Sequence, residues 1–227
     1  MLVSIPNLLD AAEIANCRQV LDAAPWVDGR VTAGQQSAKA KRNLQAPADD
    51  PAAAALGELV LTALGRNPAF LSAALPLKVF PPLFNRYEAG MGFGAHVDNA
   101  IRFVGDTTAR VRTDLSATLF LSDARDYDGG ELVIEDVFGE HAVKGEAGEL
   151  VLYPGSSLHR VEPVTRGARL AAVFWVQSMV RRDDQRTLLQ RLDEDIVATR
   201  AALGDADPTV LSLTAGYHNL LRMWADA

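Results

Sequence analysis

The stretch NRYEAGMGFGAHVD, residues 85–98, is the part of the chain on which both the expected fold and the expected chemistry depend. Residues 79–88 predict a strand, three glycines then interrupt it, and His96 and Asp98 fall in a new extended stretch. Side chains at positions i and i+2 of an extended stretch project to one face, so one metal ion could meet both. The pair is weak by itself, since roughly half a His-x-acid pair is expected by chance from this composition.

A second histidine and an arginine follow later in the chain. Residues 158–164 lead through a Thr-Arg-Gly turn into residues 168–178, with the spacing of a β-hairpin. His159 and Arg169 differ by an even number, so on two paired antiparallel strands they can face the same side. A guanidinium there could grip a carboxylate through two hydrogen bonds while the other end of the ligand reaches the metal.

His96, Asp98 and His159 together match a known metal-ligand set. Two imidazoles and one carboxylate form the facial triad that holds non-haem Fe(II) and leaves positions open for oxygen and a cosubstrate. An oxygenase is therefore the leading hypothesis. Each residue also has an ordinary role: His159 could be a hydrogen-bonded polar residue, Arg169 could form a structural salt bridge, and Tyr87 could be a core aromatic.

The motifs in this region resemble a known family. Asn85-Arg86-Tyr87, the His96-x-Asp98 pair, DGGELVI at residues 128–134, and YPGSSLHRVEPV at residues 153–164 with Arg169 behind it are similar to the 2-oxoglutarate-dependent Fe(II) dioxygenases. Among these, they resemble the bacterial PKHD-type hydroxylases related to prolyl 4-hydroxylase. The motif residues span roughly residues 78–178, without a departure at the ligand or arginine positions.

The resemblance implies a fold and a site. The fold is mainly β with flanking helices: a distorted double-stranded β-helix, or jelly roll, with N-terminal helices and a C-terminal helical appendage. His96, Asp98 and His159 would bind Fe(II) and carry the catalysis. Arg169 would pair with the C5 carboxylate of 2-oxoglutarate, and Tyr87 is a weaker candidate for the same ligand.

The resemblance also implies an activity. Fe(II) would act with 2-oxoglutarate and O2 as cosubstrates, and L-ascorbate would rescue oxidised iron. The reaction would hydroxylate an unidentified amino acid, peptide or protein residue, or small metabolite, and release succinate and CO2. The identity of this substrate is left open.

The two ends of the chain differ from its centre in composition and in expected secondary structure. Residues 1–77 are rich in alanine and leucine with helical periodicity, which predicts a helical support region. Residues 78–178 form the predicted dioxygenase core. In residues 179–227 a helix is expected from Asp183 or Asp184 and a second one after Pro208, which either cover the barrel or make a subunit contact.

Composition limits the function classes. The chain has 227 residues, 48% of them hydrophobic, enough for one large core. It lacks an apolar run of about 18 residues and a basic N-terminal region, so neither a membrane span nor a secretory signal is expected. A single cysteine, Cys17, fits a reducing compartment and hence the cytoplasm. The net charge of −7 disfavours a nucleic-acid partner and leaves a small-molecule or peptide substrate, with a homo-oligomer open.

Two rival functions stay open on the sequence. A cupin-like module would keep the barrel and bind or sense iron or a small acid without turnover, so it would form no succinate. A nucleic-acid demethylase shares the Asn-x-Tyr and His-x-Asp features but conflicts with the acidic balance of the chain. Fold alone does not separate catalysis from binding.

Overall fold

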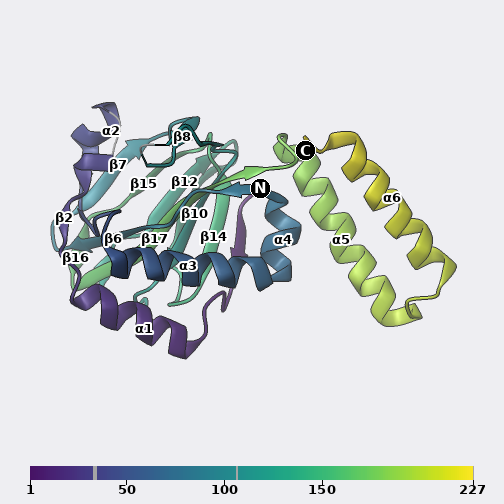
Figure 1. The fold of residues 1–227 in the computed structure, drawn as a ribbon, viewed down its shortest axis with the longest axis horizontal. Helices are drawn as coiled ribbons and strands as arrows, with labels where there is room; N and C mark the ends of the chain where they lie inside the picture. Colours follow the sequence, from purple (N-terminus) through teal and green to yellow (C-terminus); the bar gives the residue numbers. More distant parts are fainter. Residues whose placement is uncertain (33–34, 106, 227) are drawn as a thin grey trace.

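The protein is built around two antiparallel β-sheets with a cavity between them (Figure 1). The computed structural model describes residues 1–32, 35–105 and 107–226. Within these residues the larger sheet runs in the order β1-β14-β10-β17-β6-β4-β2, with β5 also paired to β17. Its strands are β1 (Val3–Ile5), β2 (Val27–Asp28), β4 (Leu44–Gln45), β5 (Pro76–Val79), β6 (Leu83–Glu88), β10 (Leu115–Phe120), β14 (Leu150–Pro154) and β17 (Ala168–Ser178).

The smaller sheet runs in the order β13-β12-β15-β7-β3 within the described residues. Its strands are β3 (Lys41–Arg42), β7 (Gly92–His96), β12 (Leu132–Asp136), β13 (Gly139–Val143) and β15 (Leu158–Val161). Two short ribbons complete the β-structure: β8 (Ile101–Phe103) with β9 (Arg110–Arg112), and β11 (Asp128–Gly129) with β16 (Val164–Arg166).

Helices cover the outer face of the larger sheet (Figure 1). They are α1 (Ala11–Asp22), α3 (Pro51–Arg66) and α4 (Pro68–Ala74); α2 (Gln35–Ala40) and the 3-10 turn η1 (Gly29–Thr32) lie near β3 and β7. Side chains such as Leu21 and Val60 pack in one core with Leu119, Leu152 and Phe174 of the sheet. Both faces of β10, β14 and β17 are therefore buried, which explains their continuous apolar sequence.

The starts of the covering helices are set by local sequence. The Asp50 side chain accepts a hydrogen bond from the Ala53 N–H at 3.1 Å, and Pro51 occupies the first position of α3. Asp10 and Glu13 form a capping box at the start of α1. Cys17, on the same helix, is fully buried, and burial raises the pKa of its thiol to about 11. No helix in the described residues is long and apolar enough to cross a membrane.

The strand predicted over residues 79–88 is wrong in its first part. β5 ends at Val79 and β6 begins at Leu83, with Pro81 and Pro82 between them. Proline lacks the N–H that a strand donates to its neighbour, so the pairing with β17 is interrupted there. The part that carries Tyr87 is nevertheless a strand, and it pairs with β17 as a central member of the larger sheet.

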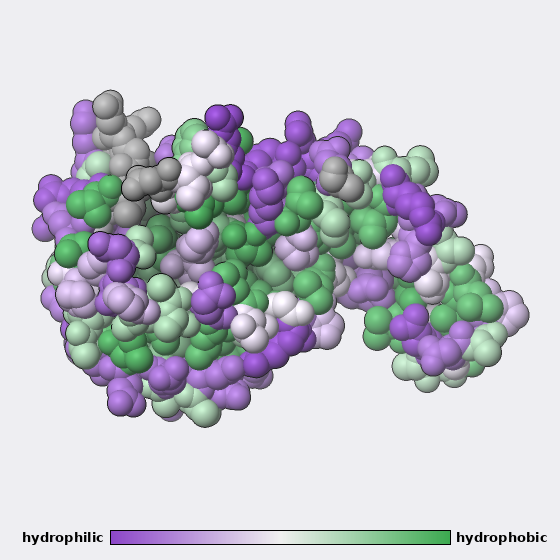
Figure 2. Space-filling model, viewed as in Figure 1, coloured by the Kyte–Doolittle hydropathy of each residue, from purple (hydrophilic) through white to green (hydrophobic). Residues whose placement is uncertain are grey.

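Helices α5 (Asp183–Leu203) and α6 (Pro208–Trp224) confirm the two helices predicted in this region, and they form a hairpin that projects to one side of the β-sheet body (Figure 1). Figure 2 shows a narrow waist between the hairpin and the body, with hydrophobic residues among hydrophilic ones on the hairpin surface. Fully buried Leu189 packs with Leu75 and Val180 to hold the hairpin against the body. Among the described residues, neither helix lines the cavity, so the hairpin does not cover the barrel. A subunit contact through the hairpin stays a prediction.

Candidate active site

The cavity between the sheets contains all five residues singled out from the sequence. Tyr87, His96, Asp98, His159 and Arg169 line it. Its remaining wall is largely apolar and comes from both sheets, with Leu83, Leu132, Val161 and Phe174 among the contributors. An apolar wall with a few convergent polar groups is typical of a small-molecule site.

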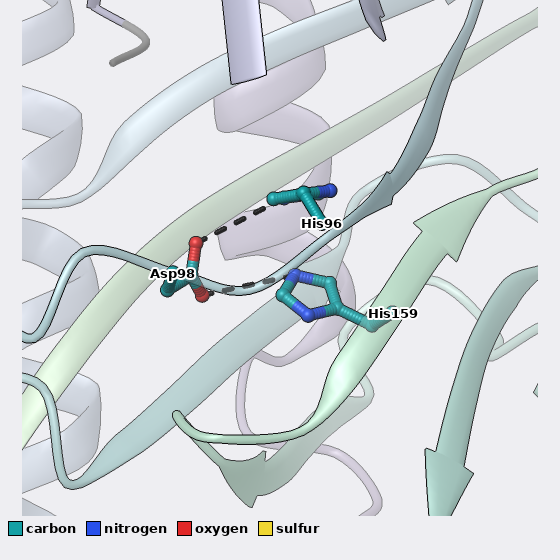
Figure 3. Close-up of side chains that lie close together, drawn as sticks. All are labelled: His96, Asp98 and His159. Atoms are coloured by element: carbon teal, nitrogen blue, oxygen red, sulfur yellow. Dashed lines mark ion pairs between the residues drawn. The ribbon is translucent and has the colours of Figure 1, made fainter. Parts of the chain in front are cut away.

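Three of these residues converge on one point. His96 is the last residue of β7, Asp98 follows two residues later, and His159 lies in β15, directly opposite His96 in the strand pairing. Both imidazoles point toward the Asp98 carboxylate (Figure 3). The Nε2 of His96 lies 3.9 Å from Asp98 Oδ1, and the Nε2 of His159 lies 3.7 Å from Asp98 Oδ2. All three ligand atoms are within 4.8 Å of one another, so one ion could bind all three.

The two histidines are held in the form that binds metals. Nδ1 of His96 lies 2.9 Å from the Gly94 carbonyl oxygen, and Nδ1 of His159 lies 3.0 Å from that of Ser157. A carbonyl only accepts hydrogen bonds, so each Nδ1 carries the proton and each Nε2 presents its lone pair to the centre. Burial, followed by the neighbouring His159, lowers the pKa of His96 to about 4, which keeps its imidazole neutral near pH 7.

A serine that the sequence does not indicate orients the carboxylate. Ser116, in β10, is buried, and its hydroxyl donates a hydrogen bond of 2.6 Å to Asp98 Oδ2. Metal-binding carboxylates are commonly fixed in this way by a neighbouring donor. Ser116 lies 18 residues from Asp98 on a separate strand, so no local pattern could connect the two.

Arg169 is a buried cation whose donors are left without acceptors. Its side chain is 1% exposed, and Nε and Nη2 have no hydrogen-bond partner among the described residues. The structural salt bridge, which was the alternative role for Arg169, is therefore not formed with these residues. Arg186, equally buried in the hairpin, instead donates to the Val180 and Arg181 carbonyls at 2.8 and 2.7 Å and pairs with Asp183 at 3.0 Å. A buried guanidinium that is not satisfied by protein acceptors is expected to bind an anionic ligand.

The hairpin predicted to join His159 and Arg169 is wrong. β15 pairs with β12 and β7 in the smaller sheet, whereas β17 pairs with β10, β6 and β5 in the larger one. The chain between them forms β16, which pairs with β11 instead. The two residues consequently come from opposite sheets and meet across the cavity, which still allows one ligand to span from the guanidinium to the metal ligands.

Aromatic rings enclose the Arg169 side chain. Tyr87 is the direct strand partner of Arg169, and the Arg169 Cζ lies 5.3 Å from the centroid of its ring and 5.1 Å from that of Phe120. Burial raises the pKa of Tyr87 to about 12, so its hydroxyl stays a neutral donor. Gly130, with φ +69°, leaves the space this arrangement needs, because a Cβ there would lie 3.1 Å from Arg169 Cδ. Tyr153, a cavity residue that the sequence did not single out, packs edge-on against His159.

The remaining two histidines, His141 and His218, lie outside the cavity. His141 is in β13 and pairs with Asp136 at 2.9 Å on the exposed side of the smaller sheet. His218 is exposed on α6. Among the described residues, the only group of histidine, cysteine and acidic side chains placed to share an ion is the cavity triad. Two imidazoles and one carboxylate suit Fe(II) with open positions, and the unsatisfied Arg169 in the same cavity suits the far carboxylate of 2-oxoglutarate.

Comparison with known proteins agrees with this geometry. A PKHD-type hydroxylase of Burkholderia lata is 61% identical to this chain over 227 residues, with all of both chains covered. This chain belongs to the PKHD-type hydroxylase family. A second member, from Methylobacillus flagellatus, is 60% identical over the same full length. A model described as the 2OG-Fe(II) oxygenase superfamily matches residues 82–177, and the PKHD-type hydroxylase C-terminal domain matches residues 183–226.

Solved structures share the fold at low sequence identity. A Pseudomonas putida prolyl-4-hydroxylase has a TM-score of 0.51 and 24% identity, covering 78% of this chain and 92% of its own. A Trichoplax adhaerens prolyl hydroxylase, solved with a peptide of hypoxia inducible factor, has a TM-score of 0.57 and 17% identity, covering 83% and 86%. The predicted jelly-roll class with terminal helices is confirmed, whereas the region boundaries after residues 77 and 178 stay predictions.

Membership also confirms the predicted enzyme class. This PKHD-type hydroxylase is an Fe(II)- and 2-oxoglutarate-dependent dioxygenase, an oxidoreductase that takes O2 as cosubstrate. The cupin-like module without turnover was the alternative to this class, and the family relationship favours the enzyme. The substrate is not identified by any of these relatives.

Proposed function

We propose that this PKHD-type hydroxylase binds Fe(II) through His96, Asp98 and His159, holds 2-oxoglutarate through Arg169, and hydroxylates a small-molecule or peptide substrate in the same cavity. The observation that carries the proposal is the pairing of two features in one cavity. Three ligand atoms converge within 4.8 Å, and a buried guanidinium with unsatisfied donors faces the same space. Either feature alone would also suit a structural site.

Each side chain has a distinct task in this proposal. His96 and His159 supply neutral nitrogen ligands, and Asp98 supplies the only negative charge of the ligand set. Arg169 fixes the orientation of 2-oxoglutarate through its C5 carboxylate, with the Tyr87 hydroxyl as a second donor. When bound, iron with 2-oxoglutarate and O2 supplies the oxidant that inserts oxygen into a C–H bond. The apolar wall excludes water from the reacting groups.

Ascorbate, location and partners are part of the same proposal. L-Ascorbate would return iron to Fe(II) after turnover without substrate. The single, buried cysteine supports a cytoplasmic protein. A small-molecule or peptide substrate is favoured over nucleic acid by the net charge of −7, and a nucleic-acid demethylase would regain support from salt-dependent binding of nucleic acid.

The test is succinate formation from 2-oxoglutarate by the purified, Fe(II)-loaded protein. Slow succinate release is expected without added substrate, with inactivation unless ascorbate is present. His159→Ala and Asp98→Ala should bind less Fe(II) and form no succinate while remaining folded, because the strands stay paired without the ion. His141→Ala is the control and should behave like the wild type. Full iron stoichiometry and succinate formation in Asp98→Ala would reject the assignment.

A further inference from the structure

Two cationic side chains line the cavity beside the metal-binding residues and have no task in the assignment of iron and 2-oxoglutarate. Lys41, in β3, is 7% exposed, and its Nζ lies 3.2 Å from Gln45 Oε1 and 5.7 Å from the centroid of the Phe93 ring. That ring stacks on His96 with centroids 3.6 Å apart. Lys41 therefore lies close to the metal-binding side of the cavity.

Arg102, in β8, approaches the same space from another side. Its Cζ lies 3.8 Å from the centroid of the Trp175 ring and 5.0 Å from that of Phe80. Among the described residues its guanidinium forms no hydrogen bond or ion pair and contacts the faces of these two rings. The aromatic rings orient the guanidinium without neutralising its charge.

The two charges are close enough to affect each other. Burial, followed by the charge of Arg102, lowers the pKa of Lys41 to about 8, and burial lowers the pKa of Arg102. The negative groups that act in the opposite direction are Asp28 and Asp98 for Lys41, and Asp98 for Arg102. Two like charges held partly out of water cost free energy, and a bound anion would relieve that cost.

The expected ligands do not neutralise this pair. The two positive charges of Fe(II) balance the two negative charges of 2-oxoglutarate. The remaining charged side chains of the cavity are Asp98 and the three cations Lys41, Arg102 and Arg169, and Asp98 acts on both Lys41 and Arg102. The cavity lining therefore carries two more positive than negative charges, in a chain whose net charge is −7. A local charge opposite to that of the whole chain is expected where an anion must be recognised.

Arg102 also lies away from Arg169, the residue assigned to 2-oxoglutarate. Arg169 and Trp175 lie six residues apart on β17, so their Cα atoms are about 20 Å apart along the strand. Arg102 stacks on Trp175, at the far end of this stretch from Arg169. Ser116, which holds Asp98, pairs with Trp175 in the sheet, and this places the metal ligands near the Arg102 end.

We infer that the substrate of this hydroxylase carries an anionic group, a carboxylate or a phosphate, that binds between Lys41 and Arg102. The rest of the substrate lies against Phe93 and Trp175, next to the metal ligands. This inference rests on the proposed function, because it assigns the part of the cavity that iron and 2-oxoglutarate leave over.

The test uses matched probes that differ only in charge. The protein is loaded with Zn(II), a redox-inert stand-in for Fe(II), and saturated with 2-oxoglutarate. A set of N-acetyl amino acids, each with its own carboxamide, is then titrated and followed by ligand-observed NMR. The acids of the best-binding pairs should bind at least tenfold more tightly than their carboxamides, and 0.5 M salt should reduce the difference because it screens partly exposed charges.

Charge variants locate the site of this preference. Arg102→Gln and Lys41→Gln should each lose most of the preference for the acid, and Arg102→Lys should recover part of it. Arg110→Gln is the matched control: Arg110 lies in the neighbouring strand β9, with its Cζ 5.2 Å from the Phe103 ring, but does not line the cavity. It should keep the full preference.

Each other outcome counts against the inference. Acids that bind no better than carboxamides, a set in which no acid binds, or a preference that survives in Arg102→Gln and Lys41→Gln would each overturn it. Weaker 2-oxoglutarate binding in Arg102→Gln would place that cation in the cosubstrate site and overturn it too. Failure of the wild type to bind 2-oxoglutarate counts instead against the proposed function, so the two failures are distinguishable in the same samples.

Discussion

At the scale of single residues, the metal site depends on side chains that do not touch the metal. The Ser116 hydroxyl holds one oxygen of Asp98, and backbone carbonyls hold the Nδ1 atoms of His96 and His159. Each ligand is therefore oriented before an ion arrives, which reduces the entropy lost on binding.

Ser116→Ala should lower the affinity for Fe(II) by roughly ten- to a hundredfold, because Asp98 loses the donor that fixes its carboxylate. Anaerobic titration with Fe(II) measures this. Ser156→Ala, an exposed serine in the loop before His159, is the control and should bind Fe(II) like the wild type. Equal affinities for both variants would contradict the role given to Ser116.

The low pKa of His96 predicts how the metal-free protein responds to acid. The pKa is about 4 in the folded protein and 6.5 in the unfolded chain, so between these values only the unfolded chain binds the proton. Stability from this source is present above pH 6.5 and is lost as the pH falls toward 4. The free energy of unfolding of the metal-free protein can be measured by denaturant at several pH values. Between pH 7.5 and pH 4 it should fall less for His96→Gln than for the wild type. Parallel losses would contradict the prediction.

At the scale of elements, the position of the site depends on which strands pair. The neighbouring strands β7 and β15 bring His96 opposite His159, while β17 delivers Arg169 from the other sheet. Gly92 permits the first of these pairings, because a Cβ there would lie 2.9 Å from the Val161 carbonyl oxygen and 3.2 Å from Pro163 Cα.

Gly92→Ala should destabilise the protein by about 1–3 kcal/mol and weaken Fe(II) binding, because backbone atoms of the neighbouring strand must move. Gly65→Ala is the control, because an added methyl group there meets no neighbouring atom. Gly65 lies in α3 with nothing within 4 Å of an added Cβ, so this change should be neutral or stabilising by up to about 1 kcal/mol. Denaturant unfolding distinguishes them, and equal effects would contradict the close approach of β7 and β15.

Sequence reasoning succeeded for elements that are determined locally. The helical periodicity of α5 and α6 and the extended stretch that becomes β17 lie within single segments. The partner of β15 could not be predicted in the same way. The short spacing between β15 and β17 allows the two strands to pair as a hairpin, but it also allows the chain to cross from one sheet to the other between them. The roles of Ser116 and Arg102 were also beyond reach, since their contacts with Asp98 and Trp175 exist only after the sheets assemble.

At the scale of the whole molecule, the C-terminal hairpin is joined to the body through a small separate cluster. Leu189 lies in that cluster and is fully buried, while its neighbour Leu188 is 51% exposed. The chain start also reaches this junction, where the Met1 amino group lies 2.6 Å from Asp183. None of these residues lines the cavity.

Leu189→Ala should therefore cost about 2–5 kcal/mol of stability with Fe(II) affinity unchanged in the folded protein. Leu188→Ala should change stability by no more than about 0.5 kcal/mol. Thermal unfolding and iron stoichiometry measure the two effects. Loss of Fe(II) binding in folded Leu189→Ala would mean that the hairpin and the metal site are coupled, contrary to the arrangement described.

The account rests on one cavity holding both Fe(II) and 2-oxoglutarate, and anaerobic titration of 2-oxoglutarate into the Fe(II)-loaded protein tests this most directly. Binding is followed by the metal-to-ligand absorbance band. Arg169→Lys keeps the charge but loses the two-pronged hydrogen bond, so its 2-oxoglutarate affinity should fall roughly ten- to a hundredfold with Fe(II) binding little changed. Arg186→Lys, the other buried arginine, should lose stability and keep its 2-oxoglutarate affinity. An unchanged dissociation constant in Arg169→Lys would contradict the account.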